Sequence, residues 1–334
     1  MTLDFEILRT LVHGAMVAEA RGGKLFLSRF TEKHKTIYPP NTGGDRRSQS
    51  LASVHLDFMT DAAELTLHYT NAWNSTSRPF FFFDLWENDV LTGHEGYLTE
   101  RSEHGRLDQP DGSVSFTLSP GTKRVCLYFP ELFHLEISGL EISDGAFVQP
   151  VRHSKTIIAF GDSITEGHDV CYAGMDYIDH FARLMGADLY NFGIGGSLFN
   201  SDLVMASELP RADIVTAAFG TNDFRHSVPE DFNREMPEFF RRLAEAYPEA
   251  RCYVILPIWR KIIKQSWELG TLEDVKAAIR AESEKYPNFR CIDGAALVPH
   301  RPEFFYDGAL HPNDLGHTLY GMNLFHAVQK LENR

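Results

Sequence analysis

The pattern of hydrophobic and polar positions divides the chain into two parts. From about residue 155 onward, short apolar runs alternate with segments whose apolar residues recur at helical spacing. Five runs are typical of buried strands: 156–160, 189–192, 214–219, 252–256 and 289–292. Four segments are patterned as helices: 177–185, 229–247, 272–286 and 315–331. Because alternating strands and helices are joined by right-handed crossovers, this part predicts a parallel sheet with helices on both faces, a three-layer α/β/α fold.

The first 150 residues lack this alternation and read as an all-β domain. Their β-like segments are 53–59, 65–69, 80–85, 113–118 and 125–129. Turn residues separate the segments, notably Pro110-Asp-Gly112 and Pro120-Gly121. This pattern is typical of an antiparallel sandwich or jelly roll. Pro150 interrupts it, so we expect a β-sandwich domain over 1–150 and an α/β domain over 151–334.

Composition narrows the class of protein. The 334 residues are 43% apolar and 23% charged, with a formal net charge of −14 and no long basic block. This argues against nucleic acid and anionic membranes as partners. No signal peptide and no 18-residue apolar run is visible, so we expect a cytoplasmic protein without a membrane partner.

The cysteines support a reducing compartment, because they are scattered and show no metal-binding spacing. Cys126, Cys252 and Cys291 fall in strand-like runs and are predicted to be buried thiols. Cys171 follows the Gly161-Asp162-Ser163 turn at a short distance, and we favour a packing role for it as well.

The strand-like run 156–160 ends in Gly161-Asp162-Ser163, the first candidate for chemistry. A serine just past the carboxyl end of a strand lies where open α/β sheets bind ligands. By itself the tripeptide is a weak signal, since Gly, Asp and Ser are ordinary turn formers.

Three further segments change this picture. Asn191–Gly196 and Gly220–Asp223 each follow a strand-like run, and Asp307–Asp314 lies near the C-terminus. The carboxyl ends of parallel strands meet at one edge of the sheet, so these motifs should lie close together.

Acyl transfer requires a nucleophile, a base, a group that orients the base, and donors to the oxyanion. Ser163 is the candidate nucleophile and His311 the candidate base, placed on a loop by Pro312. The oxyanion donors would be the backbone N–H groups of Ser163 and Gly196 and the side-chain amide of Asn222.

Over residues 154–330 these four blocks resemble the SGNH hydrolases, or GDSL-like lipase/esterase family. The resemblance implies a flavodoxin-like sheet and makes Ser163, Gly196, Asn222 and His311 the four name-giving residues. A jelly roll ahead of such a domain is similar to the family 2 carbohydrate esterases.

The chain departs from the family pattern at the acid that orients the base. The family usually spaces this pair as Asp-x-x-His, whereas Asp307-Gly-Ala-Leu-His311 carries one extra residue. Asp307 can reach His311 through a wider loop that bends at Gly308. Alternatively, a backbone carbonyl orients the imidazole and the enzyme uses a Ser–His dyad. Asp314, the other nearby carboxylate, is expected to cap the following helix.

The remaining polar motifs favour structural roles. Asp162 and Asp223 are expected to brace their turns. No metal and no cofactor is implied, because ligand spacings and nucleotide-binding glycine patterns are missing. Trp259 and Arg260 follow a predicted strand, and either line the substrate rim or pack as ordinary structural residues.

These observations predict a serine esterase that removes a short acyl group from a sugar or another hydroxylated small molecule, with acetyl as the favoured acyl group. An acyltransferase would use the same residues with an acceptor other than water. A non-catalytic carbohydrate-binding protein is the third hypothesis, which the presence of a Ser–His pair disfavours. The pattern does not predict an oligomeric state.

Overall fold

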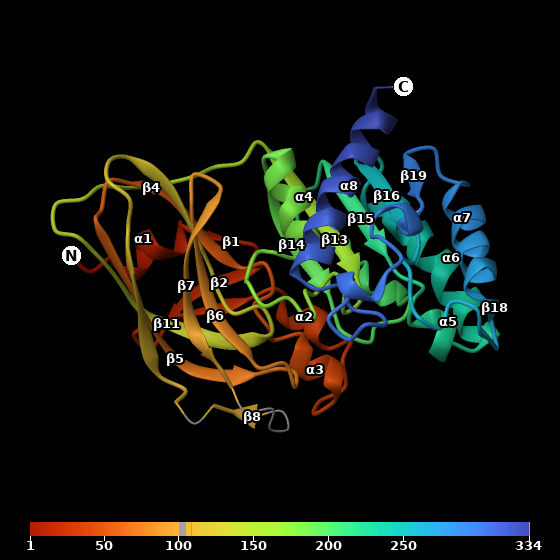
Figure 1. Ribbon diagram of the computed structural model, residues 1–334, viewed down its shortest axis with the longest axis horizontal. Coiled ribbons are helices and arrows are strands. Elements are labelled where there is room, and N and C mark those ends of the chain that lie inside the picture. Colours follow the sequence, from red (N-terminus) through yellow and green to blue (C-terminus); the bar gives the residue numbers. More distant parts are fainter. Residues whose placement is uncertain (100–104, 108, 334) are drawn as a thin grey trace. The chain divides into compact units, whose positions relative to one another are not determined.

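The computed structural model describes residues 1–99, 105–107 and 109–333 (Figure 1). The chain forms two compact units. The β-rich unit comprises 1–31, 40–153 and 171–174, and the α/β unit comprises 32–39, 154–170 and 175–334. Residues 32–39 therefore belong to the α/β unit although the β-rich unit flanks them in sequence, and residues 171–174 belong to the β-rich unit although the α/β unit flanks them. The domain division 1–150 and 151–334 remains a prediction.

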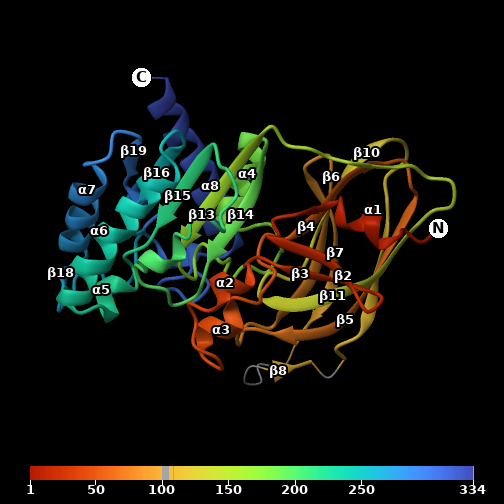
Figure 2. The same cartoon turned by 180° about the vertical axis from the view of Figure 1, so that it is seen from behind.

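Two antiparallel sheets build the β-rich unit (Figure 2). The first has the order β1-β4-β10-β6-β7, with β12 also paired to β4. Its strands are β1 (Val12–His13), β4 (His55–Thr60), β6 (Phe80–Glu87), β7 (Val90–Leu98), β10 (Lys123–Tyr128) and β12 (Val148–Pro150). The second has the order β2-β3-β11-β5-β8, with β9 also paired to β5. Its strands are β2 (Val17–Arg21), β3 (Lys24–Ser28), β5 (Glu64–Asn74), β8 (Gly105–Arg106), β9 (Gly112–Thr117) and β11 (Phe133–Ile142).

The inner faces of these sheets share one hydrophobic core. Alternate residues of β5 are buried, as expected for a strand with one face on a core. Leu67 of β5 lies in the same apolar cluster as Phe58 of β4 and Ile137 of β11. The predicted β-sandwich is therefore confirmed. Two short helices, α1 (Phe5–Arg9) and α3 (Gly43–Arg47), complete this unit.

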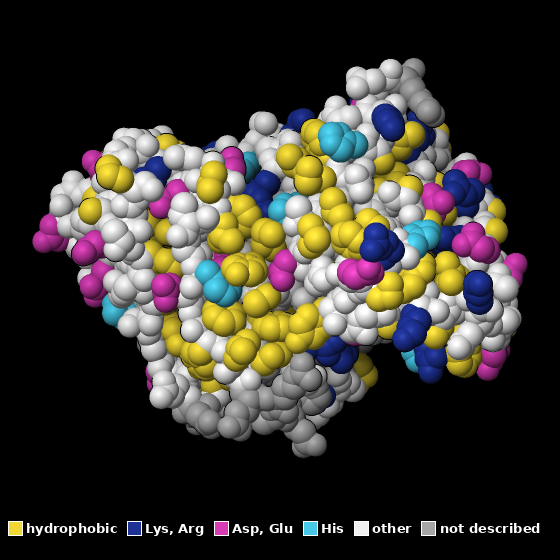
Figure 3. Space-filling model, in the orientation of Figure 1, with side chains coloured by type: hydrophobic (Ala, Val, Ile, Leu, Met, Phe, Trp, Pro, Cys, Tyr) yellow, Lys and Arg dark blue, Asp and Glu magenta, His cyan; other side chains and the backbone are white. Residues whose placement is uncertain are grey.

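The outer side of the β7 hairpin is partly apolar. Val90, Tyr97 and Leu98 on β7 are exposed, and Figure 3 shows hydrophobic side chains gathered over this part of the unit. On the same view, Lys and Arg side chains are interspersed with Asp and Glu instead of forming one basic patch.

The α/β unit is built on a five-stranded parallel sheet of order β14-β13-β15-β16-β19. The strands are β13 (Lys155–Gly161), β14 (Ala187–Gly193), β15 (Ile214–Ala218), β16 (Arg251–Ile255) and β19 (Phe289–Ile292). Numbered by sequence within this sheet, the order is 2-1-3-4-5, the flavodoxin-like arrangement. The predicted fold class is confirmed, and all five predicted strands are present.

Helices lie on both faces of this sheet (Figure 1). They are α2 (Glu32–Lys35), α4 (Tyr177–Met185), α5 (Asp223–His226), α6 (Pro229–Ala246), α7 (Leu272–Ser283) and α8 (Asp314–Glu332). Short elements complete the unit: the hairpin β17 (Ser266–Trp267) and β18 (Gly270–Thr271), and the 3-10 turns η1 (Ser201–Leu203), η2 (Gly294–Ala296) and η3 (Pro302–Phe304).

Alternation along β13 explains why both faces are covered. Ile157 and Ala159 belong to the apolar cluster that also contains residues of α4 and α8. Phe160, which points the other way, packs its ring edge-on against Phe239 of α6 at 5.7 Å between centroids. A strand buried on both faces reads as a continuous apolar run, which is how this strand was recognised.

The strand register places the carboxyl ends of three strands at one level. Gly161 at the end of β13 pairs with Gly193 of β14 and with Ala218 of β15. The order 2-1-3 makes the end of β13 the topological switch point, where adjacent loops diverge and leave a crevice. Ser163, Gly196 and Asn222 all follow these three strands within four residues.

Two further expectations can be compared with the structure. Cys126 and Cys252 are buried, but Cys171 and Cys291 are half-buried, so the prediction of a buried Cys291 was wrong. Its short strand β19 lies at the edge of the sheet, where one side lacks a neighbouring strand. No helix within the described residues combines the length and apolar character needed to cross a membrane.

Candidate active site

Ser163 lies on a tight turn directly after β13. The turn is held by backbone hydrogen bonds from Glu166 N–H to the Asp162 carbonyl and from His168 N–H to the Ser163 carbonyl. The Asp162 carboxylate accepts the N–H of Ile164 at 3.0 Å. Each of these bonds closes a short loop, so the position of the Ser163 side chain is set by the backbone.

His311 is brought to Ser163 from the other end of the domain. Its Nε2 lies 2.9 Å from the Ser163 hydroxyl oxygen, although 148 residues separate the two in sequence. His311 lies on the loop before α8, where its carbonyl accepts the N–H of Tyr306 and Phe305 bridges to Pro312. The imidazole therefore sits on a loop, as Pro312 predicts.

The Asp307 carboxylate contacts the other ring nitrogen of His311. Its Oδ2 lies 3.2 Å from Nδ1, which faces away from Ser163. Its Oδ1 accepts the backbone N–H groups of Ala309, Leu310 and His311 at 2.8, 2.7 and 3.2 Å. Gly308 adopts φ +61°, so the extra residue is taken up in a left-handed bend. This geometry supports the triad alternative.

The electrostatics of Asp307 agree with this contact. Partial burial works to raise the pKa of its carboxyl. Hydrogen bonds from His311 and from the backbone N–H groups outweigh burial and hold this pKa well below its usual range. Asp307 is therefore an anion when His311 acts as a base, and its charge assigns the ring proton to Nδ1. Nε2 is then left to accept the Ser163 hydroxyl proton.

A second carboxylate, Asp169, meets the same ring nitrogen, and the sequence analysis missed it. Its Oδ2 lies 3.4 Å from His311 Nδ1, and its side chain is 2% exposed. Asp169 has φ +69°, a left-handed conformation that Asp adopts more readily than most residues. Nothing in the pattern Glu166-Gly-His-Asp169 distinguishes this aspartate from an ordinary turn residue. Its role depends on the course of the backbone through the turn, which the sequence alone does not show.

The three expected oxyanion donors lie on neighbouring loops. Among the described residues, neither the Ser163 N–H nor the Gly196 N–H donates a hydrogen bond. Gly196 is exposed and has φ +79°, a conformation that favours glycine. Asn222 donates one amide hydrogen to the Ser197 carbonyl at 3.1 Å, which ties its side chain to the Gly196 loop. Asn222 lies at the N-terminus of α5, and among the described residues no acceptor is seen for its second amide hydrogen.

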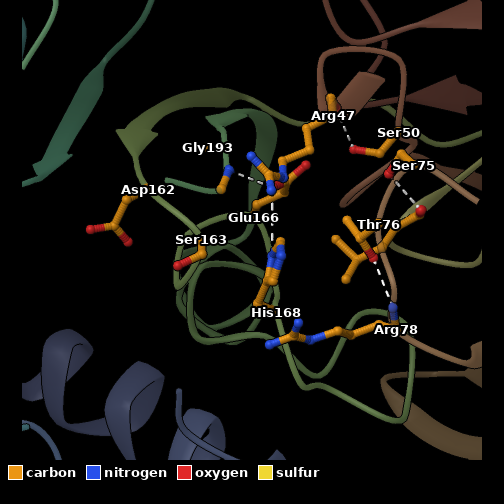
Figure 4. A network of polar contacts seen from close by, with 12 residues as sticks. Arg47, Ser50, Ser75, Thr76, Arg78, Asp162, Ser163, Glu166, His168 and Gly193 are labelled. Carbon is orange, nitrogen blue, oxygen red and sulfur yellow. Dashed lines mark hydrogen bonds and ion pairs between the residues drawn. The ribbon is translucent and has the colours of Figure 1, made fainter. Parts of the chain in front are cut away.

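Glu166 is a buried support beneath the Gly196 loop. Its carboxylate accepts the Gly195 N–H at 2.6 Å and lies 3.6 Å from His168 Nδ1. Figure 4 shows the His168 ring turned toward Glu166, one turn beyond Ser163. The His168 ring in turn stacks on His311, with 5.7 Å between centroids.

Gly193 allows the two loops to approach. A Cβ at this position would lie 2.5 Å from the backbone nitrogen of Glu166 and 2.7 Å from the carbonyl carbon of Thr165. The contact is between backbones, so no side-chain rotation could relieve it. The glycine is therefore required for the spacing between the Ser163 turn and the Gly196 loop.

Asp162 and Asp223 brace their loops, as expected for carboxylates on turns. Asp223 accepts the N–H of Phe199 and the hydroxyl of Ser227. Burial raises the pKa of Asp162 and of Asp223 to about 6. A cavity of about 20 Å³ beside Asp162 has room for one water molecule and none for a substrate.

Trp259 and Arg260 lie close to the site without touching its reacting groups. Arg260 is buried, donates to the Thr221 carbonyl and lies over the Phe224 ring. Trp259 is half-buried against Phe305, 4.8 Å between ring centroids. Within the described part of the chain, no hydrogen bond, ion pair or ring contact joins either of them to Ser163 or His311. Their place at the substrate rim remains a proposal.

Two smaller expectations concern capping and metal binding. The N-cap of α8 is Asn313, whose side chain accepts the Gly316 N–H, and Asp314 is the first helical residue. The prediction that Asp314 caps this helix was therefore wrong by one residue. Asp169, Asp307 and His311 offer possible ligand atoms within 4.8 Å of one another. A metal ion on Nδ1 would have to replace the proton that otherwise faces these carboxylates.

Residues 159–319 match the model of the GDSL-like lipase/acylhydrolase family. No curated protein matches the chain significantly.

Solved structures resemble the chain over nearly its whole length. Salicylyl-acyltransferase SsfX3 from a tetracycline biosynthetic pathway has a TM-score of 0.79 at 20% identity, covering 96% of this chain and 94% of that one. A Bacteroides ovatus protein described as a GDSL-like lipase has a TM-score of 0.77 at 17% identity, covering 100% and 98%. A family 2 carbohydrate esterase from Clostridium thermocellum, solved with cellohexaose, has a TM-score of 0.64 at 13% identity, covering 93% and 99%. At these identities the likeness establishes the fold.

Proposed function

We propose that this chain is a carboxylic ester hydrolase of the serine hydrolase class, which the match of residues 159–319 to the GDSL-like lipase/acylhydrolase family supports. Its substrates are short acyl esters, acetyl esters first, of a sugar or another hydroxylated small molecule. The observation that carries the proposal is the 2.9 Å contact between Ser163 Oγ and His311 Nε2. A hydroxyl and an imidazole at this distance, with a carboxylate on the far ring nitrogen, have the arrangement that activates a serine.

The proposed reaction begins at the Ser163 hydroxyl. Its oxygen attacks the ester carbonyl carbon while His311 Nε2 takes the hydroxyl proton. The carbonyl oxygen becomes an oxyanion, which receives hydrogen bonds from the Ser163 and Gly196 N–H groups and the Asn222 amide. The imidazolium then gives its proton to the leaving alcohol, and an acyl-enzyme remains. Water, deprotonated by His311, attacks the acyl carbon and releases the acid and the serine.

The carbohydrate part of the proposal is supported by architecture. The Clostridium thermocellum carbohydrate esterase combines the same two kinds of fold and was solved with cellohexaose. Because the identity is 13%, substrate choice for this chain depends on loops that the comparison does not describe.

Acyl transfer to an alcohol is the second candidate. It is favoured by the likeness to salicylyl-acyltransferase SsfX3, which extends over both units. The same acyl-enzyme serves both reactions, and only the group that attacks it differs. A purely carbohydrate-binding role is disfavoured because binding alone has no use for a Ser–His pair at bonding distance.

The first experiment measures hydrolysis of p-nitrophenyl acetate, butyrate and octanoate, with labelling by a serine-reactive fluorophosphonate. Acetate should be the best substrate, and Ser163→Ala should abolish both turnover and labelling. Ser154→Ala, an exposed serine outside the site, serves as the control. Retention of more than about a tenth of the turnover by Ser163→Ala would exclude Ser163 as the nucleophile.

A second measurement separates hydrolysis from transfer. The release of p-nitrophenol is compared with the release of free acetate in the presence of a soluble sugar as acceptor. Equal amounts indicate hydrolysis. A deficit of acetate, matched by acetylated sugar, identifies the protein as an acyltransferase.

A further inference from the structure

The Nδ1 atom of His311 faces two carboxylates, not one. Asp307 Oδ2 forms a hydrogen bond with it at 3.2 Å, and Asp169 Oδ2 lies at 3.4 Å, within ion-pair distance of the protonated ring. We propose that Asp169 is a second positioning residue for His311, which holds the imidazole in place and stabilises its protonated form together with Asp307. This inference rests on the proposed function, because it assigns a role in the same acyl transfer.

The two carboxylates differ in their exposure to water. Asp307 is 34% exposed, and one of its oxygens already accepts three backbone N–H groups. Asp169 is 2% exposed and approaches Nδ1 from the protein interior. A charge shielded from water interacts more strongly with an imidazolium at the same distance. The burial of Asp169 therefore offsets the effect of its longer distance to Nδ1 on its attraction to the imidazolium.

The fold delivers Asp169 from the same turn as the nucleophile. After Ser163, the chain closes successive turns with Gly167 N–H bonded to the Ile164 carbonyl and Val170 N–H bonded to the Gly167 carbonyl. Gly167 and Asp169 both have positive φ, at 82° and 69°. The left-handed backbone at these two residues reverses the direction of the chain after Ser163. As a result, the Asp169 carboxylate comes within 3.4 Å of His311 Nδ1. One rigid turn thus holds both the hydroxyl on Nε2 and a carboxylate on Nδ1.

This arrangement has a consequence for the base. Two like charges near one N–H repel each other, and protonation of the ring relieves that repulsion. Each carboxylate consequently favours the imidazolium that forms when Ser163 attacks. Loss of either one should leave the other in place, which predicts partial redundancy.

Other ionisable groups also face His311. His168 stacks on its ring and lies beside Glu166. Asp162 and His317 interact with it through charge. None of these has a recorded contact with Nδ1 among the described residues, so the effect of Asp169 can be isolated by substitution.

The test compares Asp169→Asn, Asp307→Asn and the double variant. Asparagine adopts the left-handed conformation at least as readily as aspartate, so the turn should be preserved. Each single variant should lose about 10-fold in kcat with little change in KM, and the double variant about 10,000-fold, far more than the product of the singles. Asp314→Asn removes a carboxylate at the start of α8, three residues after His311, and should behave as wild type, because no hydrogen bond or ion pair joins the two residues in the described part of the chain.

The pH profile provides a readout that a merely structural role would not move. Each carboxylate favours the protonated ring, so its removal should shift the acid limb of kcat/KM toward lower pH. Activity loss with a lowered melting temperature and an unmoved acid limb would overturn the proposal. Unchanged kinetics of Asp169→Asn in both the wild-type and the Asp307→Asn backgrounds would overturn it as well.

A measurement without substrate separates this proposal from the proposed function. Nitrogen-15 NMR of labelled histidine reports the fraction of ring with the proton on Nδ1, with the His311 signal identified by its loss in His311→Gln. Asp169→Asn should lower that fraction at pH 8, and the double variant should lower it further. An unchanged fraction would refute the role of Asp169. An enzyme that turns over no ester, yet shows these changes, would refute the proposed function alone.

Discussion

Asn222→Ala is the substitution that best tests the oxyanion site. The Asn222 amide has two hydrogens, and one of them bonds to the Ser197 carbonyl at 3.1 Å. The other is the one assigned to the substrate oxyanion. Because Asn222 makes no capping bond to α5, the change should leave this helix intact. The substitution therefore removes one catalytic and one structural hydrogen bond.

The two losses differ in size and in the quantity they affect. Removal of one oxyanion donor costs about 2.7–4 kcal/mol of transition-state stabilisation, or about 100- to 1000-fold in kcat. KM should change little, because the ester carbonyl of the bound substrate carries much less negative charge than the oxyanion. The lost bond to Ser197 should lower the free energy of unfolding by about 1 kcal/mol.

The assay measures kcat and KM separately for p-nitrophenyl acetate, together with urea unfolding. The rate of fluorophosphonate labelling should fall in parallel with kcat, because that reaction also develops charge on an oxygen in the oxyanion site. Asn200→Ala is the matched control: this asparagine caps η1 in the same unit and lies outside the site. A raised KM with unchanged kcat would refute the assignment, as would an equal loss of kcat in the control.

Three further predictions concern the stability of the fold. Burial raises the pKa of Asp223 to about 6, above its unfolded value of about 4, so its contribution to stability is present below pH 4 and lost as the pH rises through 6. Asp223→Asn should reduce the loss of unfolding free energy between pH 4 and pH 7 by up to about 3 kcal/mol, as measured by urea unfolding at both pH values. An unaltered pH dependence would contradict the raised pKa of Asp223. Gly193→Ala should lower the free energy of unfolding by at least about 1–3 kcal/mol, because its Cβ would meet the backbone nitrogen of Glu166 at 2.5 Å. Gly139→Ala, which meets no atom within 3.4 Å, is the control, and equal losses in both variants would contradict the steric argument. A fragment of residues 154–334 lacks the segment that contains α2, whose His34 ring packs on Phe192, and should aggregate; a soluble, fully active fragment would contradict this.

The strands and helices of the α/β unit were predictable because each one is marked along the chain itself. The strand 289–292 and the helix 177–185 were predicted with the bounds that the structure has. The helix is marked by a 3.6-residue apolar period, and the strand by three apolar residues interrupted only by Arg290. Where the bounds differ, as at α7, which ends at Ser283 instead of residue 286, the last turn is decided by packing.

Several strands of the β-rich unit were not predicted, for the opposite reason. β2 and β7 are largely exposed and mix polar with apolar residues, so neither an apolar run nor a clean alternation marks them. β11 is mostly buried but includes His134, Glu136 and Gly139, and its pairing with β5 is interrupted by register shifts. The strand conformation of β2 and β7 depends on hairpin pairing with β3 and β6, and that of β11 depends on pairing with β5, which is distant in sequence.

The sequence by itself determined which residue types could perform acyl transfer and in which order they occur. It left open whether Asp307 reaches His311, because one extra residue in a loop can turn a side chain toward the ring or away from it. The left-handed bend at Gly308 and three backbone hydrogen bonds decided that the carboxylate meets Nδ1. The contact of Asp169 with the same nitrogen was decided only by tertiary structure. Local pattern records which residues prefer a strand, a helix or a turn, whereas a distance of about 3 Å between side chains depends on strand register and on the dihedral angles of several loops together.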